Sequence, residues 1–278
     1  MLKRAYIEIT NICNLRCEFC PGTKRQTREM SEGEFRAIAE KLCGAVKYLY
    51  FHVMGEPLLH GEITKFLDIA KELGFRVCLT TNGTLLGRRG RELLSHSALH
   101  KVSVSLHSME GNGISDLQSY LEDVWEFSVN AAESGVIVAL RLWNIGGADE
   151  RNGDILAFLE EKLGIPPLTM PQPRDGNWKL REKIYLEQAE RFEWPDLAAG
   201  EAEVRFCLGL RQQIAVLCDG TVVPCCLDHE GDIPLGNLLT QELNTILTSP
   251  RAKALFDGFS NGKPSEELCR RCGYATRF

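Results

Sequence analysis

The sequence lacks three features that would direct a protein to membranes, to export or to long nucleic acids. No run of about 18 apolar residues, the length of a membrane-spanning helix, occurs in the 278 residues. The N-terminal residues contain no apolar core of a signal peptide, so we expect a cytoplasmic protein with no membrane partner. Lysine and arginine number 32 against 38 aspartates and glutamates, which gives a net charge of −6. A large nucleic-acid partner is therefore not expected, although a single nucleotide remains a candidate substrate.

Cysteine, in contrast, is abundant, with eleven residues in the chain. A reducing cytoplasm disfavours disulfides, so clustered thiols indicate metal binding or redox chemistry. Cys43 and Cys78 stand apart from the others and are predicted to be buried thiols of the core. The remaining cysteines form one group near the start and one in the last quarter: Cys13, Cys17 and Cys20, then Cys207, Cys218, Cys225, Cys226, Cys269 and Cys272.

Short apolar runs alternate with amphipathic stretches from residue 4 to about residue 170. Such alternation is typical of parallel βαβ units with right-handed crossovers. We therefore predict an α/β fold with a partial (β/α)6 TIM-like barrel. The predicted strands are Arg4–Thr10, Lys47–Val53, Arg76–Thr81, Lys101–His107, Val136–Trp143 and Ile165–Met170. The predicted helices between them are Ser31–Cys43, Glu62–Leu73, Arg88–Ser97, Ser115–Ser134 and Glu150–Leu163.

The chain changes character after residue 170. Residues 166–178 contain four prolines and a glycine, which mark a boundary, and a helix is predicted over Lys179–Phe192. Gln212–Leu217 and Thr221–Cys226 flank Asp219-Gly220, the signal of a β-hairpin. So short a C-terminal region builds little core and is expected to need a metal staple. The predicted domains are the barrel over 1–170, a linker and helix over 171–200, and a small hairpin-plus-helix domain over 201–278.

Alternation along the strands separates an outward apolar set from an inward polar set. In Lys101–His107, for example, Val102 and Val104 belong to the apolar set. Buried polar groups need partners, and a ligand with amino, carboxylate and hydroxyl groups would supply them. The predicted inward polar residues are Glu8, His52, Ser103, Ser105, His107 and Arg141.

The first cysteine group has the spacing C-x3-C-x2-C directly after the first predicted strand, with Phe19 before the last cysteine. The thiolates of Cys13, Cys17 and Cys20 can hold three corners of a [4Fe–4S] cluster and leave the fourth iron open. A zinc site, the alternative, needs a fourth ligand and usually uses C-x2-C pairs. The spacing resembles the radical S-adenosylmethionine (SAM) superfamily. That resemblance implies that SAM binds the open iron and is cleaved to a 5′-deoxyadenosyl radical, which abstracts a substrate hydrogen.

Further segments resemble the SAM-binding elements of that superfamily. Met54-Gly55-Glu56-Pro57 is similar to its Gly-Gly-Glu-Pro motif, which holds the methionine amino group, with Met54 in place of the first glycine. Asn82-Gly83 is similar to its Thr-Asn-Gly turn, and Arg141 to the arginine that pairs with the SAM carboxylate. A plain turn, a loop carboxylate and a structural ion pair are the alternatives for Asn82, Glu56 and Arg141. The resemblance thus implies the SAM-binding residues Phe19, Gly55, Glu56, Asn82, Ser103, Ser105 and Arg141.

The second cysteine group resembles the C-terminal SPASM extension of this superfamily in its shortened twitch form. Cys207 is followed by twelve residues, Gly220, four residues and Cys225, and the chain closes with Cys269-x2-Cys272. The resemblance implies one auxiliary [4Fe–4S] cluster with these four cysteines as ligands, which suits electron relay or structure because no iron stays open. A structural zinc site is the alternative. Cys226 is an alternative ligand to Cys225, and Cys218 has no assigned role.

The resemblance predicts an enzyme, a lyase or an oxidoreductase, which receives electrons from a low-potential donor such as flavodoxin or ferredoxin. Relatives with SPASM or twitch extensions modify peptides, dehydrogenate sulfatase serines or oxidise aminocyclitols. The first cluster cysteine is residue 13, so no leader-peptide-binding domain is expected ahead of it, which favours a small-molecule substrate. The run Tyr6–Cys13 and the ending Leu268–Tyr274 resemble queuine lyases, which free queuine from a queuosine nucleotide. Two other functions stay open: a peptide- or protein-modifying maturase, dehydrogenase or epimerase, and a non-catalytic metal-binding module.

Few residues are candidates for substrate contacts. Glu8 is a candidate acceptor for the edge of a nucleobase, or alternatively an ion-pair partner of Arg141. His52 and His107 are candidate substrate residues, or alternatively satisfied histidines of the core. The candidates for a substrate phosphate, alternatively a solvated charged loop, are Lys24, Arg25 and Arg28.

Overall fold

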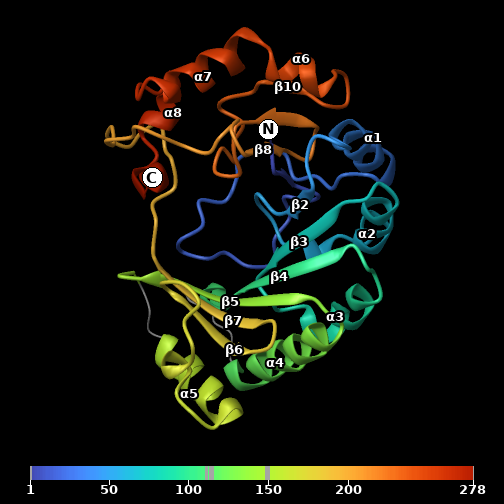
Figure 1. Ribbon diagram of the computed structural model, residues 1–278, viewed down its shortest axis with the longest axis vertical. Coiled ribbons are helices and arrows are strands. Elements are labelled where there is room, and N and C mark those ends of the chain that lie inside the picture. Colours follow the sequence, from blue (N-terminus) through green and yellow to red (C-terminus); the bar gives the residue numbers. More distant parts are fainter. Residues whose placement is uncertain (1, 110–111, 113–115, 148–150, 278) are drawn as a thin grey trace. The chain divides into compact units, whose positions relative to one another are not determined.

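The computed structural model describes residues 2–109, 112, 116–147 and 151–277 (Figure 1). Internal contacts divide the chain into two compact units. The first unit comprises Met1–Ile12, Pro21–Arg76 and Phe192–Phe278, and the second comprises Cys13–Cys20 and Val77–Arg191. Each unit therefore combines segments that are distant in sequence. Among the described residues, no helix is both long and apolar enough to cross a membrane.

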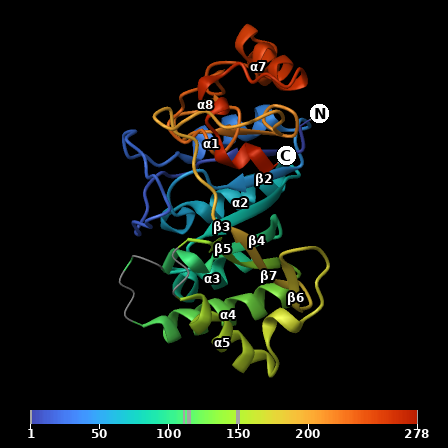
Figure 2. The same ribbon diagram turned by 90° about the vertical axis from the view of Figure 1, so that its left-hand side faces the viewer.

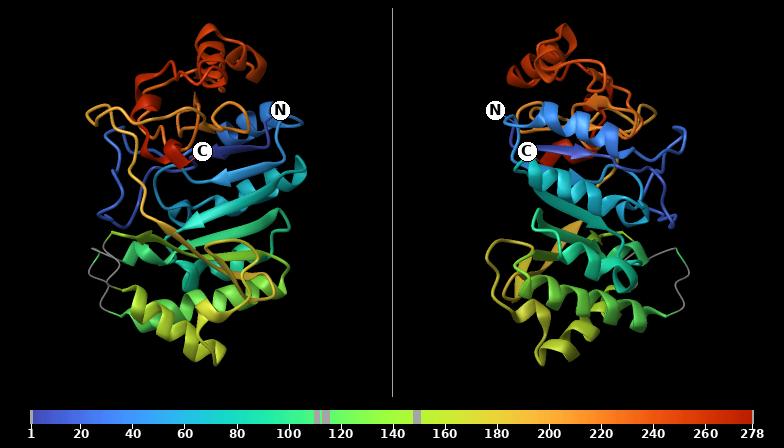
Figure 3. Two further views of the ribbon diagram at one scale, coloured as in Figure 1. Left: turned by 60° about the vertical axis from the view of Figure 1, so that its left-hand side comes forward. Right: turned by 90° about the vertical axis from the view of Figure 1, so that its right-hand side faces the viewer.

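The first unit is built on a sheet whose strands come from both ends of the chain (Figure 3). Strand β1 pairs in parallel with β2 on one side and with β8 on the other. Strand β9 pairs antiparallel with β8 and with β10. The C-terminal hairpin is therefore present as predicted, and it extends the N-terminal sheet. In spatial order the strands are β10 (Gly236–Asn237), β9 (Thr221–Val223), β8 (Gln213–Val216), β1 (Arg4–Ile7) and β2 (Tyr48–Phe51).

Helices α1 (Glu32–Leu42) and α2 (Ile63–Glu72) follow β1 and β2 and pack beside each other (Figure 3). Three aromatic rings join these elements. The ring of Phe35 on α1 lies 5.5 Å from that of Phe51 on β2 and 4.5 Å from that of Phe66 on α2. All three rings are fully buried, so they form the apolar layer between sheet and helices. The other helices of the unit are η1 (Pro57–Leu59), α6 (Leu243–Leu247), α7 (Pro250–Ser260), α8 (Glu267–Arg270) and η4 (Gly273–Arg277).

The second unit is a mostly parallel sheet with long helices along it (Figure 2). β3, β4, β5 and β7 run parallel, and β6 closes the edge antiparallel to β7. The expected α/β class is confirmed. The strands in spatial order are β3 (Arg76–Thr81), β4 (Leu99–Ser105), β5 (Ile137–Ile145), β7 (Ile184–Glu190) and β6 (Asn177–Arg181). The helices are α3 (Leu86–Leu94), η2 (Leu106–Met109), α4 (Leu117–Glu133), α5 (Asn152–Leu163) and η3 (Pro167–Thr169).

Two predicted elements are wrong, and both lie between residues 165 and 192. Ile165–Met170 contains the short helix η3 instead of a strand, because its prolines cannot donate to a sheet. Lys179–Phe192 forms β7 and part of β6 instead of a helix. Its residues favour helix locally, but burial alternates at Ile184 and Leu186, and the edge of β5 offers a partner for a strand. The first five predicted strands and all five predicted helices before residue 164 are present. The strand Arg76–Thr81 has its predicted bounds, and the other elements differ at one or both ends. Ser115 and Glu150 lie outside the described residues.

Gly55 occupies a tight passage directly after β2. Its φ is +79°, and a Cβ atom there would lie 2.4 Å from the carbonyl oxygen of Thr10 and 2.9 Å from that of Ile12. The amide of Glu56 donates to the same Ile12 oxygen at 2.8 Å. Met54 does not need the positive φ of a glycine, so the methionine at this position leaves the backbone path intact. Gly55 thus allows the chain that leaves β2 to pack against the chain that enters the cysteine loop.

We predict that Gly55→Ala destabilises the protein far more than Gly44→Ala. Gly44 also has a positive φ, +77°, but a Cβ atom added there would meet nothing within 4 Å. Gly44→Ala should lower the free energy of unfolding by about 1–2 kcal/mol, the strain of a left-handed residue. Gly55→Ala adds a clash with rigid backbone and should lose about 1–3 kcal/mol more. Urea denaturation measures both variants, and equal losses would contradict the tight passage.

Candidate functional site

The loop of the first three cysteines contacts the turn that follows β4. Cys13 and Cys20 are exposed and Cys17 is partly buried. The sulfur of Cys17 lies 3.4 Å from Nδ2 of Asn112 and 3.7 Å from the carbonyl oxygen of Ser108. Burial raises the pKa of Cys17, and the neighbouring cysteines raise it further, so metal binding at this thiol releases a proton.

Asn82 holds both its own turn and the cysteine loop. Its Nδ2 donates to Oδ1 of Asn14 at 2.9 Å, and Asn14 Nδ2 donates to Oγ1 of Thr84 at 2.9 Å. Its Oδ1 accepts the backbone amide of Thr84 at 3.0 Å. The hydroxyl of Tyr120 on α4 donates to the carbonyl oxygen of Asn82 at 2.9 Å. The turn after β3 is therefore fixed from α4 and in turn fixes the start of the cysteine loop.

The predicted serines and arginine lie on adjacent strands. Ser105 on β4 is the register partner of Arg141 on β5, and Ser103 lies two residues earlier on β4. Ser103 is buried, whereas Ser105 and Arg141 are partly exposed. Arg141 Nε donates to Oε2 of Glu187 on β7 at 3.2 Å. The described ion-pair partner of Arg141 is thus Glu187. The sequence alone does not predict this pair, because its local pattern places Glu187 in a helix over 179–192 and not on a strand beside β5.

His107 is buried beside the cysteine loop. Its ring lies 4.8 Å from that of Phe19, and its Nδ1 lies 3.0 Å from the carbonyl oxygen of Arg141. Burial lowers the pKa of His107 to about 4; the hydrogen bond to the Arg141 carbonyl opposes this shift, and the charge of Arg141 adds to it. At neutral pH the imidazole is therefore uncharged, and Nδ1 donates to that carbonyl.

In the first unit, Glu56 shapes the loop after β2. The residue is buried, and its side chain accepts the amide of Leu58 at 3.0 Å, which caps η1. This cap and the bond from the Glu56 amide to Ile12 fix both sides of the residue.

Glu8 is fully buried, and the chain occupies both of its carboxylate oxygens. Oε2 accepts from the guanidinium of Arg25 at 2.7 Å and from the amide of Met54 at 3.2 Å. Oε1 accepts from the amide of Cys218 at 3.3 Å and lies 3.1 Å from its sulfur. A substrate hydrogen bond to Glu8 would therefore have to displace one of these groups.

His52 packs into an aromatic group of the first unit. Its ring lies 5.0 Å from that of Tyr6 and 5.9 Å from that of Tyr50. These contacts account for the position of the imidazole within the aromatic group.

The four predicted auxiliary cysteines all lie in the first unit. Cys207 precedes β8, Cys225 follows β9, and the last two flank the end of α8. Burial raises the pKa of all four thiols, and Cys207 raises it further in each of the other three. Cys207 thus interacts with each of the other three thiols, a grouping that suits one cluster ligated by all four. Among the described residues, no three His, Cys, Asp or Glu side chains are arranged around a single metal ion.

The structure distinguishes the remaining cysteines. The Cys226 side chain is hydrogen-bonded to the Tyr6 hydroxyl and also interacts with Cys207. Cys225 interacts with Cys226, Cys207 and Cys269. Cys218 is buried against Glu8. Cys78 is buried as predicted. The prediction for Cys43 is wrong, because this residue ends α1 and is exposed.

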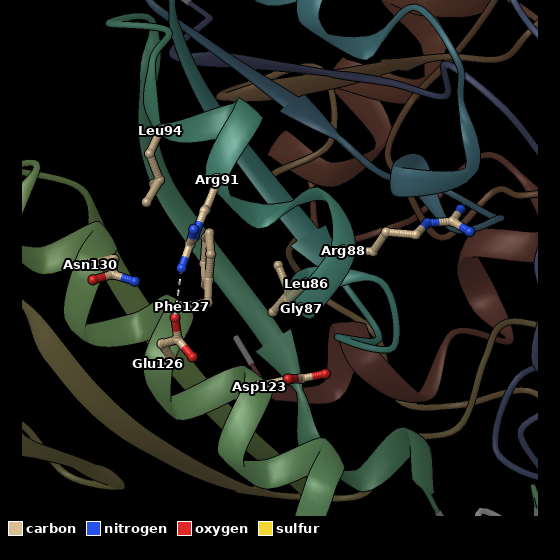
Figure 4. Close-up of a pocket in the computed structure, with 9 residues that line it drawn as sticks. All are labelled: Leu86, Gly87, Arg88, Arg91, Leu94, Asp123, Glu126, Phe127 and Asn130. Carbon is tan, nitrogen blue, oxygen red and sulfur yellow. Dashed lines mark hydrogen bonds and ion pairs between the residues drawn. The ribbon is translucent and has the colours of Figure 1, made fainter.

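A cavity of about 380 Å³ lies between α3 and α4 (Figure 4). Gly87 and Gly90 let the two helices approach, and Arg91 pairs with Glu126 across the cavity at 3.3 Å. Its lining contains none of the predicted site residues. The predicted site residues are divided between the two units. Those in the second unit are Cys13, Cys17, Phe19, Cys20, Asn82, Ser103, Ser105, His107 and Arg141. Those in the first unit are Glu8, His52, Gly55, Glu56 and the auxiliary cysteines.

Sequence reasoning missed three polar residues of the site. Asn14 and Asn112 position the cysteine loop, and Glu187 pairs with Arg141. Asn14 lies between two cluster cysteines, which was an available signal. Asn112 and Glu187 are near their partners only through tertiary structure, at sequence separations of 95 and 46 residues.

Sequence comparison finds two families in the chain. A model of the Radical SAM superfamily matches residues 7–159, and a model described as an iron–sulfur cluster-binding domain, SPASM, matches residues 207–273. A tungsten-containing aldehyde ferredoxin oxidoreductase cofactor-modifying protein of Pyrococcus furiosus is 41% identical over 93 residues, 31% of this chain and 25% of that protein. A GTP 3′,8-cyclase of Aquifex aeolicus is 32% identical over 178 residues, 59% of this chain and 54% of that protein. The chain thus spans between a quarter and about half of these relatives' lengths.

Solved structures with this fold cover nearly the whole chain. BtrN in complex with AdoMet and 2-DOIA matches with a TM-score of 0.64 at 19% identity, over 98% of this chain and 93% of that chain. Streptococcus suis SuiB bound to precursor peptide SuiA matches with a TM-score of 0.61 at 15% identity, over 99% of this chain and 70% of that chain. The expected TIM-like core followed by an iron–sulfur domain is confirmed. The chain belongs to the radical SAM superfamily, whose members use SAM and a [4Fe–4S] cluster, and it carries a C-terminal SPASM domain for auxiliary iron–sulfur binding.

Proposed function

We propose that this chain is a radical enzyme that cleaves SAM reductively and abstracts a hydrogen atom from a small-molecule substrate. The observation that carries the proposal is the grouping in the second unit. There, the three-cysteine loop is hydrogen-bonded to Asn82 and Asn112, and the same unit holds Arg141. A non-catalytic metal-binding module has no need for such SAM-directed residues.

The residues divide the work of holding the cluster and SAM. Cys13, Cys17 and Cys20 hold three irons of the cluster, whose chemistry is reductive cleavage of the SAM sulfonium. Asn112 donates a hydrogen bond to the Cys17 sulfur, which favours the thiolate over the thiol. Arg141 pairs its guanidinium with the SAM carboxylate.

For the substrate we propose a queuosine nucleotide, from which the enzyme releases queuine. The segments Tyr6–Cys13 and Leu268–Tyr274 motivate this choice. The name GTP 3′,8-cyclase, carried by several matched relatives, supports a purine-like nucleotide as substrate class. Of the three loop cations, Arg25 pairs with Glu8 and Arg28 with Glu34, so Lys24 is the proposed phosphate contact.

A peptide substrate is the second candidate. Two structures of similar fold hold peptides, SuiB with its precursor peptide and anSMEcpe with the Cp18Cys peptide. Under this alternative the enzyme is a SPASM maturase, dehydrogenase or epimerase. Either substrate requires a low-potential electron donor such as flavodoxin or ferredoxin.

The first test measures 5′-deoxyadenosine from anaerobically reconstituted protein, SAM and dithionite, with and without queuosine 5′-phosphate. We expect a substrate-dependent rise together with free queuine. Cys17→Ala should abolish 5′-deoxyadenosine, whereas Cys43→Ala should keep it, because Cys43 is an exposed thiol at the end of α1. A slow formation of 5′-deoxyadenosine at the same rate with and without the nucleotide would exclude the lyase function and favour a peptide substrate. No 5′-deoxyadenosine from iron-loaded protein would refute SAM cleavage.

The second test counts metal in the C-terminal domain. We expect about eight irons per wild-type chain, for two [4Fe–4S] clusters, and about four in the double variant Cys269→Ser/Cys272→Ser. Cys226→Ser should keep about eight irons, because that side chain is hydrogen-bonded to Tyr6. Cys225→Ser should lower the iron count. Four irons and one zinc in the wild type would establish the zinc alternative.

The third test concerns His107. Since burial lowers its pKa to about 4, only about 1% of its imidazole is protonated at pH 6. We therefore expect the rate of 5′-deoxyadenosine formation between pH 6 and 8 to have the same shape in wild type and His107→Gln. An ionisation near pH 6.5 that only the wild type shows would assign His107 a proton-transfer role.

A further inference from the structure

Glu187 is a buried carboxylate that the proposed reaction leaves without a role. It lies on β7 in register with Arg141 on the neighbouring parallel strand β5. Residues in register on parallel strands present their side chains to the same face of the sheet. Glu187 is 7% exposed, so its charge needs partners within the protein.

Three cations and an amide supply those partners. Oε2 accepts from Nε of Arg141 at 3.2 Å. Oε1 lies 3.0 Å from Nζ of Lys101, 3.5 Å from Nδ2 of Asn177 and 3.6 Å from the guanidinium of Arg174. Burial raises the pKa of Glu187, but Lys101 and Arg141 outweigh it and hold the pKa below its ordinary value. The carboxylate is thus charged at neutral pH and shared by three positive side chains.

The same contacts restrict the guanidinium of Arg141. Glu187 occupies Nε, and the ring of Trp143 lies 4.3 Å from the central carbon. A guanidinium is planar, so one hydrogen bond at Nε and one ring against the plane fix its orientation. Within the described part of the chain, no residue hydrogen-bonds to its two terminal nitrogens. The edge formed by these two nitrogens can receive a carboxylate through two parallel hydrogen bonds.

The negative charge of Glu187 also affects the positions of the cations around it. Without its carboxylate, the partly buried Lys101 and Arg141 and the largely exposed Arg174 would lose the counter-charge that they share. Like charges at such separations repel, and the flexible side chains would move apart. The orientation of Arg141 therefore depends on the charge of Glu187 as well as on its shape.

We propose that Glu187 is a positioning residue for SAM, which holds Arg141 with its two terminal nitrogens toward the methionine carboxylate. The inference rests on the proposed function, which assigns Arg141 to that carboxylate. It adds that the recognition unit is a pair of side chains on β5 and β7.

The test compares two ligands on anaerobically reconstituted holoenzyme by equilibrium binding. S-adenosylhomocysteine carries the amino-acid carboxylate, and 5′-methylthioadenosine lacks it. Glu187→Gln should weaken the binding of S-adenosylhomocysteine about tenfold, because this ligand reaches Arg141 through its carboxylate. The affinity for 5′-methylthioadenosine should change less than about twofold. Glu182→Gln is the matched control, since Glu182 lies in the exposed turn of the same hairpin and pairs with Lys179. It should change neither ligand.

Glu187→Asp keeps the negative charge but shortens the side chain by one methylene, and it is the second test variant if Glu187→Gln does not fold. It should weaken the binding of S-adenosylhomocysteine, by a smaller factor than Glu187→Gln, and leave the binding of 5′-methylthioadenosine unchanged. Equal weakening of both ligands, or no change in either, would overturn the positioning role.

Arg141→Gln separates the two claims. If this variant discriminates between the ligands and the Glu187 variants do not, the inference fails and the assignment of Arg141 stands. If Arg141→Gln also fails to discriminate, the assignment of Arg141 in the proposed function fails with it.

Discussion

A buried carboxylate that must be satisfied from within the chain organises the first unit. Glu8 has no exposed surface, and its two oxygens receive donors from three segments that are far apart in sequence: Arg25 after the cysteine loop, Met54 after β2 and Cys218 after β8. Leaving any one donor out would strand part of a charge in a low-dielectric interior. The return of the cysteine loop, the glycine motif and the C-terminal hairpin are therefore tied to one point.

The second unit applies the same constraint with Glu187. This carboxylate gathers Lys101, Arg141 and Arg174 from β4, β5 and the segment before β6. The hydrogen-bonded asparagines Asn82 and Asn112 act at the turns after β3 and β4, where they hold the cysteine loop. Ligands of parallel α/β sheets bind beyond the carboxyl ends of the strands, and these turns lie at those ends. The cysteine loop thus belongs to the same unit as Arg141, the residue proposed to bind the SAM carboxylate.

Burial makes proton release a part of metal binding at these thiols. Burial raises the pKa of Cys17 and of the four auxiliary cysteines, so each thiol stays neutral until a metal displaces its proton. The auxiliary cysteines lie on a loop, after a short strand and around a four-residue helix, elements that are short and have little core of their own. The contribution of cluster binding to the order of this region stays a prediction, made from its short length.

The sequence by itself determined the features that depend on local spacing. The C-x3-C-x2-C loop, the glycine motif at Gly55 and the alternation of strands and helices to residue 163 could be predicted, because each needs only neighbours within a few residues. The pattern from Cys207 to Cys272 extends over most of the C-terminal region and could be predicted from its resemblance to the SPASM extension. Tertiary structure alone decided the rest. Lys179–Phe192 has helical propensity, yet it became a strand because the edge of β5 had hydrogen bonds to satisfy. The partners of Glu8 and Glu187 come from segments up to 210 residues away, and only the packed chain selects which cation meets which buried carboxylate.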